Sequence, residues 1–223
     1  MQRDAFSIGN ALTVGWEAFK KEAGVLIAVT VIFMVLSGGI NFTFQVSYEV
    51  LFEVLNIPLI VGATLLGILI NVFLQIGLIK VTLSIIDGRK GDVGELFGGA
   101  PHFLKVLGAS LLYGLIVMGG LILLIVPGII WGIKYFFFDY LIIDEDRDIV
   151  EAFRKSGEIT RGQLLNLFLF GLLMGVINMG GAMLCGVGII FTMPITMMAV
   201  VYVYRMLNRE KDPGSDPGSG LEI

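Results

Sequence analysis

The sequence carries little charge and few of the side chains that build catalytic or metal sites. Only 15% of its 223 residues are charged, and it has one cysteine, Cys185, and one histidine, His102. A lone cysteine excludes an intrachain disulfide and a cysteine-based zinc site, and a lone histidine leaves little material for a metal site or a catalytic triad. The G-x-S-x-G, phosphate-loop and H-E-x-x-H motifs are missing as well. We therefore expect neither enzymatic activity nor a cofactor.

Basic residues are also scarce, and their gaps are informative. The net charge of -4 and the pI near 5.0 provide no basic field for nucleic acid, which we do not expect as a partner. Lys and Arg are absent from residues 22–79, 106–133 and 162–204. Hydrophobic residues make up 56% of the chain, with a mean hydropathy of +0.89, and a water-soluble fold could not bury so many. The first and last gaps each have room for two membrane crossings of about 20 residues, and the middle one does if it is extended to Arg147.

The predicted fold is an all-α integral membrane protein with six transmembrane helices arranged as three hairpins. The turns within the hairpins contain no Lys or Arg, so the positive-inside rule places these turns outside the cell and both termini in the cytoplasm. The predicted location is the inner (cell) membrane. Residues 1–208 would form the transmembrane domain, and residues 209–223, rich in Pro, Gly and Ser, a flexible tail. The crossings are predicted near residues 25–47, 58–86, 104–126, 128–143, 163–184 and 188–207, with turns near 49–57, 126–128 and 185–188.

Each predicted hairpin follows a short amphipathic segment, and the three segments can be aligned. Ser7, Asp92 and Asp148 align as N-caps, and Glu95 and Glu151 follow their caps by three residues, as in a capping box. The apolar positions form a stripe that suits the headgroup boundary of a membrane. This pattern has two readings: a threefold repeat of interfacial helix plus hairpin, starting near residues 7, 92 and 148, or the features that any loop needs to re-enter a membrane.

The segment before the first crossing mixes aromatic and basic side chains. Trp16, Phe19, Lys20 and Lys21 stand together there, as anchors at a membrane interface do. We predict that they hold this segment at the membrane surface and contact membrane lipids.

Four polar residues of the second crossing share one helix face. Thr64, Asn71, Gln75 and Thr82 are spaced 7, 4 and 7 residues apart, which puts them on one side at 3.6 residues per turn. We expect this face to point inward. Such residues either hydrogen-bond across helices or line a polar pathway.

Lys134 is predicted to lie well inside the fourth crossing. A charge at the centre of a crossing costs at least about 2.5 kcal/mol, so this side chain should face the bundle, form a pair or reach the interface. Asp139 is the nearest acidic residue, but a spacing of five residues on one helix is poor for pairing, so the partner could come from another helix. Lys134 is either structural or part of a transport or ligand site.

Two charged runs have plain structural readings. The run DGRKGD at residues 87–92 could contact phosphate, and the acidic residues 144–148 could attract a cation. We favour a solvated loop for the first run, and a helix end followed by a cap accounts for the second.

Residues 96–162 contain the segments LFGGAPHFLKVLG, GGLILLIVPGIIWGIKYFFFDYLIIDED and EAFRKSGEITRG. In their order of an apolar hairpin around Pro127-Gly128, an acidic end at Asp144 and then Ala152-x-x-x-Ser156, they resemble a family of uncharacterised bacterial membrane proteins. That family is related to the membrane domain of some glycerophosphodiester phosphodiesterases. The resemblance implies a polytopic helical fold but no phosphodiesterase activity, because that chemistry belongs to a separate soluble domain.

Two functions are compatible with these features. The first is a non-enzymatic membrane protein with an organising, assembly or accessory role, which would contact a membrane-protein partner or further copies of itself. The second is a small transporter or channel for an ion or small solute that uses Lys134 and the polar face of the second crossing.

Overall fold

The computed structural model describes residues 6–52, 57–184 and 186–211, and most of these residues are helical. These ranges contain no β-strand, so the all-α prediction is confirmed. Side chains are described throughout except at residues 40–52, 57, 59, 60 and 63. In chain order the elements are α1 (Ile8–Lys21), α2 (Ala23–Phe52), α3 (Ile57–Ile86), the 3₁₀ helices η1 (Val93–Phe97) and η2 (Ala100–His102), α4 (Phe103–Leu123), α5 (Ile125–Lys134), α6 (Phe138–Glu145), α7 (Ile149–Ile159), α8 (Leu164–Met183) and α9 (Ile189–Lys211).

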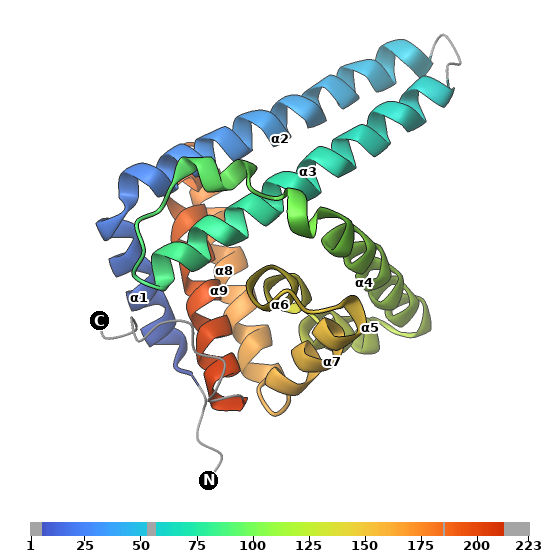
Figure 1. Cartoon of the computed structure of the whole chain (residues 1–223). Helices are drawn as coiled ribbons and strands as arrows, with labels where there is room; N and C mark the ends of the chain where they lie inside the picture. Colours follow the sequence, from blue (N-terminus) through green and yellow to red (C-terminus); the bar gives the residue numbers. More distant parts are fainter. Residues whose placement is uncertain (1–5, 53–56, 185, 212–223) are drawn as a thin grey trace.

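The long helices follow the predicted crossings closely and pack in pairs. α2 lies against α3, α4 against α5, and α8 against α9 (Figure 1). Within the described residues, five helical segments are long and apolar enough to cross a membrane. A sixth is added if α1 and the first part of α2, which are bent by 96°, count as one span. The several apolar helices indicate insertion into a membrane, as the hydropathy predicts.

Glycines hold two of these helix pairs close together near their turns. A Cβ atom on Gly120 of α4 would lie 2.7 Å from the Cα of Gly128 in α5. In the loop before α9, a Cβ on Gly188 would lie 2.5 Å from the carbonyl oxygen of Gly181 in α8. Neither position could carry a side chain at this separation, so both turns depend on small residues.

The turn between α4 and α5 lies at Leu124, and the predicted turn at residues 126–128 is wrong by a few residues. Leu124 has an extended backbone with φ −165° and ψ 151°. Pro127 falls in the first turn of α5, where its missing N–H would have no partner within the helix in any case. Gly128 therefore serves the contact with α4 rather than the turn.

The aligned segments before the hairpins differ in form. Ser7, Asp92 and Asp148 all occupy N-cap positions, and the carboxylate of Asp92 accepts a hydrogen bond from the Gly94 N–H at 2.8 Å. After Asp92, however, the chain forms η1 and η2 instead of an amphipathic α-helix. Three glycines and Pro101 in this stretch disfavour a continuous α-helix. The threefold repeat stays a prediction.

α1 and α7 turn their apolar faces toward the bundle, whereas the stripe was predicted to lie on a membrane boundary. Phe153 and Ile159 of α7 are buried. A Cβ atom on Gly15 of α1 would lie 2.8 Å from the carbonyl oxygen of Ile195, so α1 packs tightly on α9. Packing against these helices buries the stripe without any need for lipid.

The predicted anchor residues divide in the same way. Trp16 is 48% exposed, and Lys20 and Lys21 are exposed, so these three side chains are available to a membrane interface. Phe19 is buried and meets Phe191 of α9 edge-on, with 6.4 Å between ring centroids. The prediction is wrong for Phe19, which is a packing residue.

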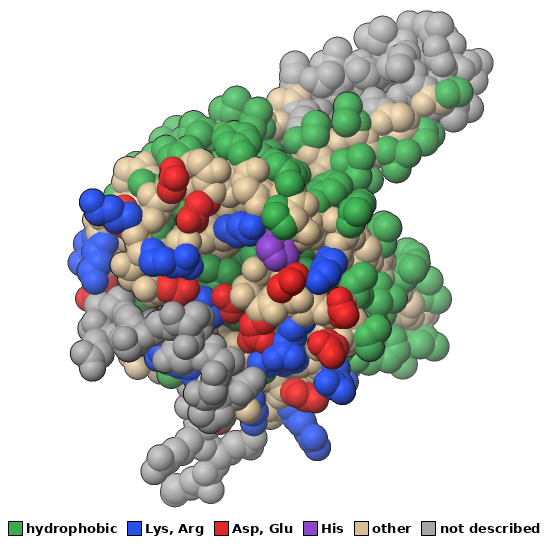
Figure 2. All heavy atoms as spheres, in the orientation of Figure 1, with side chains coloured by type: hydrophobic (Ala, Val, Ile, Leu, Met, Phe, Trp, Pro, Cys, Tyr) green, Lys and Arg blue, Asp and Glu red, His purple; other side chains and the backbone are tan. Residues whose placement is uncertain are grey.

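The buried core lies at the end of the helix pairs away from their turns. Toward the turns, each pair moves away from the other pairs. In α4 the buried Val106 and Ala109 lie in the first third, and most side chains of residues 111–126 are exposed. In Figure 1 the pair α2–α3 extends well beyond the remaining helices. Figure 2 shows charged side chains gathered over one region, while hydrophobic side chains cover much of the rest of the described surface on this face. We call the region of gathered charges the charged end.

Parts of three predictions lie outside the described residues, one of them at residue 185 of the predicted turn at 185–188. α2 ends at Phe52 and α3 begins at Ile57, so the predicted first turn falls partly on residues 53–56. α9 continues to Lys211, three residues beyond the predicted end of the transmembrane domain, and residues 212–223 of the predicted tail are not described.

Candidate functional site: a charged clamp and a broken helix

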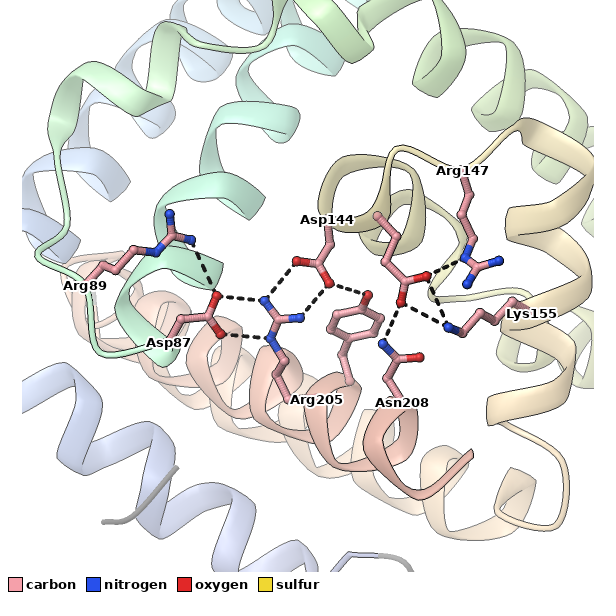
Figure 3. A network of polar contacts seen from close by, with 9 residues as sticks. Asp87, Arg89, Asp144, Arg147, Lys155, Arg205 and Asn208 are labelled. Atoms are coloured by element: carbon pink, nitrogen blue, oxygen red, sulfur yellow. Dashed lines mark hydrogen bonds and ion pairs between the residues drawn. The ribbon is translucent and has the colours of Figure 1, made fainter. Parts of the chain in front are cut away.

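Arg205 of α9 lies between two carboxylates at the charged end (Figure 3). Its Nε and Nη2 donate to Asp87 Oδ1 and Oδ2 at 3.0 and 2.8 Å, and its Nη1 and Nη2 donate to Asp144 Oδ2 and Oδ1 at 2.5 and 2.9 Å. Tyr204 adds a hydroxyl that donates to Asp144 at 2.8 Å. The Arg205 side chain is 5% exposed, so this is a buried, doubly bidentate arrangement.

A third carboxylate, that of Glu145, is held beside Asp87 and Asp144. It accepts from Lys155 Nζ at 3.1 Å, from Asn208 Nδ2 at 2.7 Å, and from the Arg147 guanidinium. The Lys155 side chain is 8% exposed, so this ammonium is also removed from water and needs its carboxylate partner.

Together these contacts join the end of α3 to α6, α7 and α9 at one end of the molecule. Asp87 follows α3, Asp144 and Glu145 end α6, and α9 supplies the remaining groups together with α7. The arrangement matches every buried cation with a carboxylate and leaves no spare base or nucleophile among its members, so its chemistry is that of a structural joint. We call it the clamp; it consists of Asp87, Asp144, Glu145, Lys155, Tyr204, Arg205 and Asn208.

A more exposed contact borders the clamp. Lys105 Nζ donates to Asp146 Oδ1 at 2.9 Å. This hydrogen bond and the charge of Lys105 hold the pKa of Asp146 below its ordinary value. The acidic run 144–148 is therefore occupied by basic partners. Within the described residues, no group of three acidic, His or Cys side chains could hold a metal ion.

The predicted fourth crossing is broken where α5 ends. Residues 135–137 leave the helix, and the carbonyl oxygen of Lys134 accepts hydrogen bonds from Ser156 Oγ at 3.1 Å and Thr160 Oγ1 at 3.0 Å. Ser156 Oγ also accepts from the Phe137 N–H at 3.2 Å. Both hydroxyl residues are fully buried. α7 thus supplies the partners that the backbone loses at the break.

Lys134 is the last residue of α5, so it lies at this break and not within a continuous helix as predicted. Its ammonium lies 5.1 Å from the centre of the Tyr135 ring. Within the described part of the chain it forms no ion pair, and Asp139 is not its partner. The side chain borders a pocket of about 590 Å³ between α5, α7 and the start of α8. Trp131, Tyr135, Arg154, Arg161 and Leu164 also line this pocket, which we call the Lys134 pocket.

The predicted polar face of α3 does not form one site. Asn71 Nδ2 donates to the Gly67 carbonyl at 2.9 Å and Thr82 Oγ1 to the Leu78 carbonyl at 2.8 Å, both within the helix. Thr64 is exposed, so the expectation that the whole face points inward is wrong there.

One pair of the predicted polar residues does meet. Gln75 Nε2 donates to the buried Asp139 of α6 at 3.2 Å, although Gln75 itself is exposed. This single cross-helix hydrogen bond fits the structural reading of the polar face rather than a pathway.

A second cavity, of about 550 Å³, lies between the pair α4–α5 and the helices α8 and α9. Its walls are almost entirely apolar. The hydroxyl of Tyr113, which borders it, donates to the Gly132 carbonyl at 2.9 Å. This crevice suits hydrocarbon or an apolar helix face rather than an ion.

Sequence reasoning missed the most elaborate polar arrangement. Arg205 stands within the apolar run VVYVYRMLN, and a charge in such a run is a signal for a buried partner. Lys80 gives the same signal in the second crossing, and its Nζ donates to the Gly98 carbonyl at 2.7 Å. Nothing in the sequence pairs Arg205 with Asp87 or Asp144, since 118 and 61 residues separate them.

Comparison with known proteins gives relatives whose own roles are undescribed. A family model described as a domain of unknown function, DUF7847, matches residues 57–210. Three uncharacterised proteins, one of Mycobacterium bovis and two of Mycobacterium tuberculosis, are similar to this chain. Each is 22% identical to it over an alignment of 230 positions, and the alignment covers 93% of this chain and 70% of the relative. No solved structure matches the chain.

Proposed function

This chain belongs to the DUF7847 family, and from that premise and its geometry we propose that it is a non-enzymatic integral membrane protein with an organising, assembly or accessory role. The observation that carries the proposal is the difference between the two ends of the helix pairs. Buried polar side chains close on one another in the clamp, while the apolar outer parts of the pairs separate and stay exposed. A crevice between separated pairs offers other membrane components a place to pack.

The proposed setting is the cell membrane, with six crossings and both termini in the cytoplasm. The charged end then faces the cytoplasm, as the positive-inside rule requires of its Lys and Arg residues. The three pairs would be copies of one hairpin unit, and the relation to the membrane domain of glycerophosphodiester phosphodiesterases is part of the same proposal.

A photoreactive residue on the exposed apolar surface of α8, which we call the apolar flank, would test the accessory role. Leu172 and Val176 of α8 are 57% and 54% exposed. With a photocrosslinker at either position in native membranes, we expect discrete crosslinked protein species. Val150 of α7, 77% exposed but outside this flank, is the control position and should give none of these species. If both flank positions yield only lipid adducts, no protein packs there and the accessory role is refuted.

The second candidate is a small transporter or channel. The break between α5 and α6 beside Lys134 favours it, because interrupted helices recur at the substrate sites of transporters. The predicted polar face of α3 supplies no pathway toward this break, since Asn71 and Thr82 bond to their own helix. The accessory role is therefore the better supported of the two.

A further inference from the structure

The Lys134 pocket gathers positive charge. Lys134, Arg154 and Arg161 line it, and Glu158 is the acidic residue among its lining side chains. Glu158 lies 4.0 Å from Arg154, and both are more than 60% exposed, so this pair is weak. Lys134 and Arg161 form no ion pair within the described residues. The pocket thus carries two cations beyond the one that Glu158 offsets, and it favours an anion.

The pocket also lies where exposed apolar and charged surfaces meet. Arg161 stands just before α8, and Leu165 in the first turn of α8 is 70% exposed. Trp131 of α5 and Tyr135 just after it are residue types that collect at membrane interfaces, and both line the pocket. In the proposed topology, this boundary is the level of the phospholipid headgroups on the cytoplasmic side.

The position of Lys134 is fixed by its neighbours. A Cβ atom on Gly157 of α7 would lie 3.0 Å from Lys134 Cε, so the lysine side chain passes directly over this glycine. The hydroxyls of Ser156 and Thr160 hold the Lys134 carbonyl from the same helix. These contacts with α7 therefore hold Lys134 at the wall of the pocket.

We propose that the Lys134 pocket binds the headgroup of an anionic phospholipid. Lys134 and Arg161 would contact the phosphate oxygens, with Arg154 at the solvent side. Ile130, Trp131 and Leu164 would contact the first carbons of the acyl chains. The volume of about 590 Å³ lies within the range of small-molecule sites, roughly 300–1,000 Å³. This inference depends on the membrane location but not on the accessory role.

Trp131 provides a local reporter of this lipid. The chain has two tryptophans, so the Trp16→Phe variant leaves Trp131 as its one indole. The purified full chain is reconstituted into vesicles of neutral phosphatidylcholine with a minority of anionic phosphatidylglycerol, and bromine, a quencher of indole fluorescence, is placed on the acyl chains of one lipid at a time. We expect brominated phosphatidylglycerol to quench Trp131 several-fold more than its share of the vesicle predicts.

The change Lys134→Gln with Arg161→Gln should remove this preference. Each basic side chain near an anionic surface contributes about fivefold to affinity, so the double variant should lose roughly 25-fold in relative affinity for the anionic lipid. Lys90→Gln removes an exposed basic residue outside the pocket and should leave the preference unchanged. If the double variant does not fold, the single variants Lys134→Gln and Arg161→Gln should each show a loss of about fivefold.

Two other outcomes refute the lipid site but leave the membrane location in place, and a third contradicts both. Equal quenching by the two brominated lipids would show that Trp131 meets lipid but that the pocket has no preference for anionic headgroups. Displacement of the anionic lipid by millimolar inorganic phosphate would show a phosphate site without lipid specificity. Absence of quenching by either lipid would place Trp131 away from the membrane and contradict the proposed topology as well.

Discussion

Replacement of Arg205 by Met should lower the free energy of unfolding by about 3 kcal/mol, since removal of one partner from a buried ion pair costs about 3–5 kcal/mol. The change leaves Asp87 and Asp144 facing each other without their shared cation, and Tyr204 still donates to Asp144. Unfolding of the purified protein in mixed detergent micelles, followed by circular dichroism, measures the loss. Lys211→Met removes an exposed cation at the end of the same helix and should change stability by less than about 0.5 kcal/mol.

A triple variant separates the cost of leaving two carboxylates without a cation from the stabilisation that the clamp provides. Asp87→Asn and Asp144→Asn, added to Arg205→Met, remove the uncompensated carboxylates, and neutral replacements of buried pairs are often tolerated. We expect the triple variant to recover at least half of the stability that Arg205→Met loses. If Arg205→Met alone unfolds like the unaltered protein, Arg205 does not join the helix pairs and the clamp is refuted.

Replacement of Gly77 by Ala should destabilise the protein by about 2–3 kcal/mol, because overpacking a tight contact typically costs about 1–3 kcal/mol. A Cβ atom at this position in α3 would lie 1.9 Å from the carbonyl oxygen of Leu96 and 2.6 Å from its Cα. These are backbone atoms of η1, so no side-chain rotation relieves the clash. Lys80 and Ser84 bond to the same segment, at Gly98 and Glu95, and would be displaced with it.

The control for Gly77 lies on the same helix. Among the described side chains, none has an atom within 4 Å of a Cβ placed on Gly62, so Gly62→Ala meets no described neighbour. Ala favours a helix over Gly by about 1 kcal/mol, and this variant should be as stable as the unaltered protein or slightly more so. Thermal unfolding of both variants by circular dichroism gives the comparison. Stabilisation by Gly77→Ala as well would mean that η1 does not rest on α3.

The sequence is a good guide to the long helices because hydropathy alone identifies them. The stretches without Lys and Arg at residues 22–79 and 162–204 contain most of the long helices α2, α3, α8 and α9. Local irregularities are harder to predict. Pro127-Gly128 has the sequence of a turn. In the structure, however, Pro127 lies in the first turn of α5 and Gly128 at the contact with α4, and the same two residue types are common in both settings.

The candidate site depends on contacts between distant parts of the chain, and periodicity does not predict these. Arg205 and Asp87 lie on different helix pairs, and a single sequence carries no information on which charge meets which. The break at Lys134 depends on Ser156 and Thr160 of α7, which look like ordinary polar residues of an amphipathic helix. The prediction for Phe19 is wrong for the same reason, because its partner Phe191 belongs to the last helix.

The most direct test of the central claim, an accessory rather than a conducting role, is the flux of ions and small solutes into liposomes that contain the purified protein. Lys134→Met is measured in parallel, because Lys134 is the charge beside the break in the fourth crossing. We expect folded protein to give no flux above that of protein-free liposomes, with or without the substitution. Flux through the unaltered protein that Lys134→Met abolishes would contradict the accessory role and make transport the function.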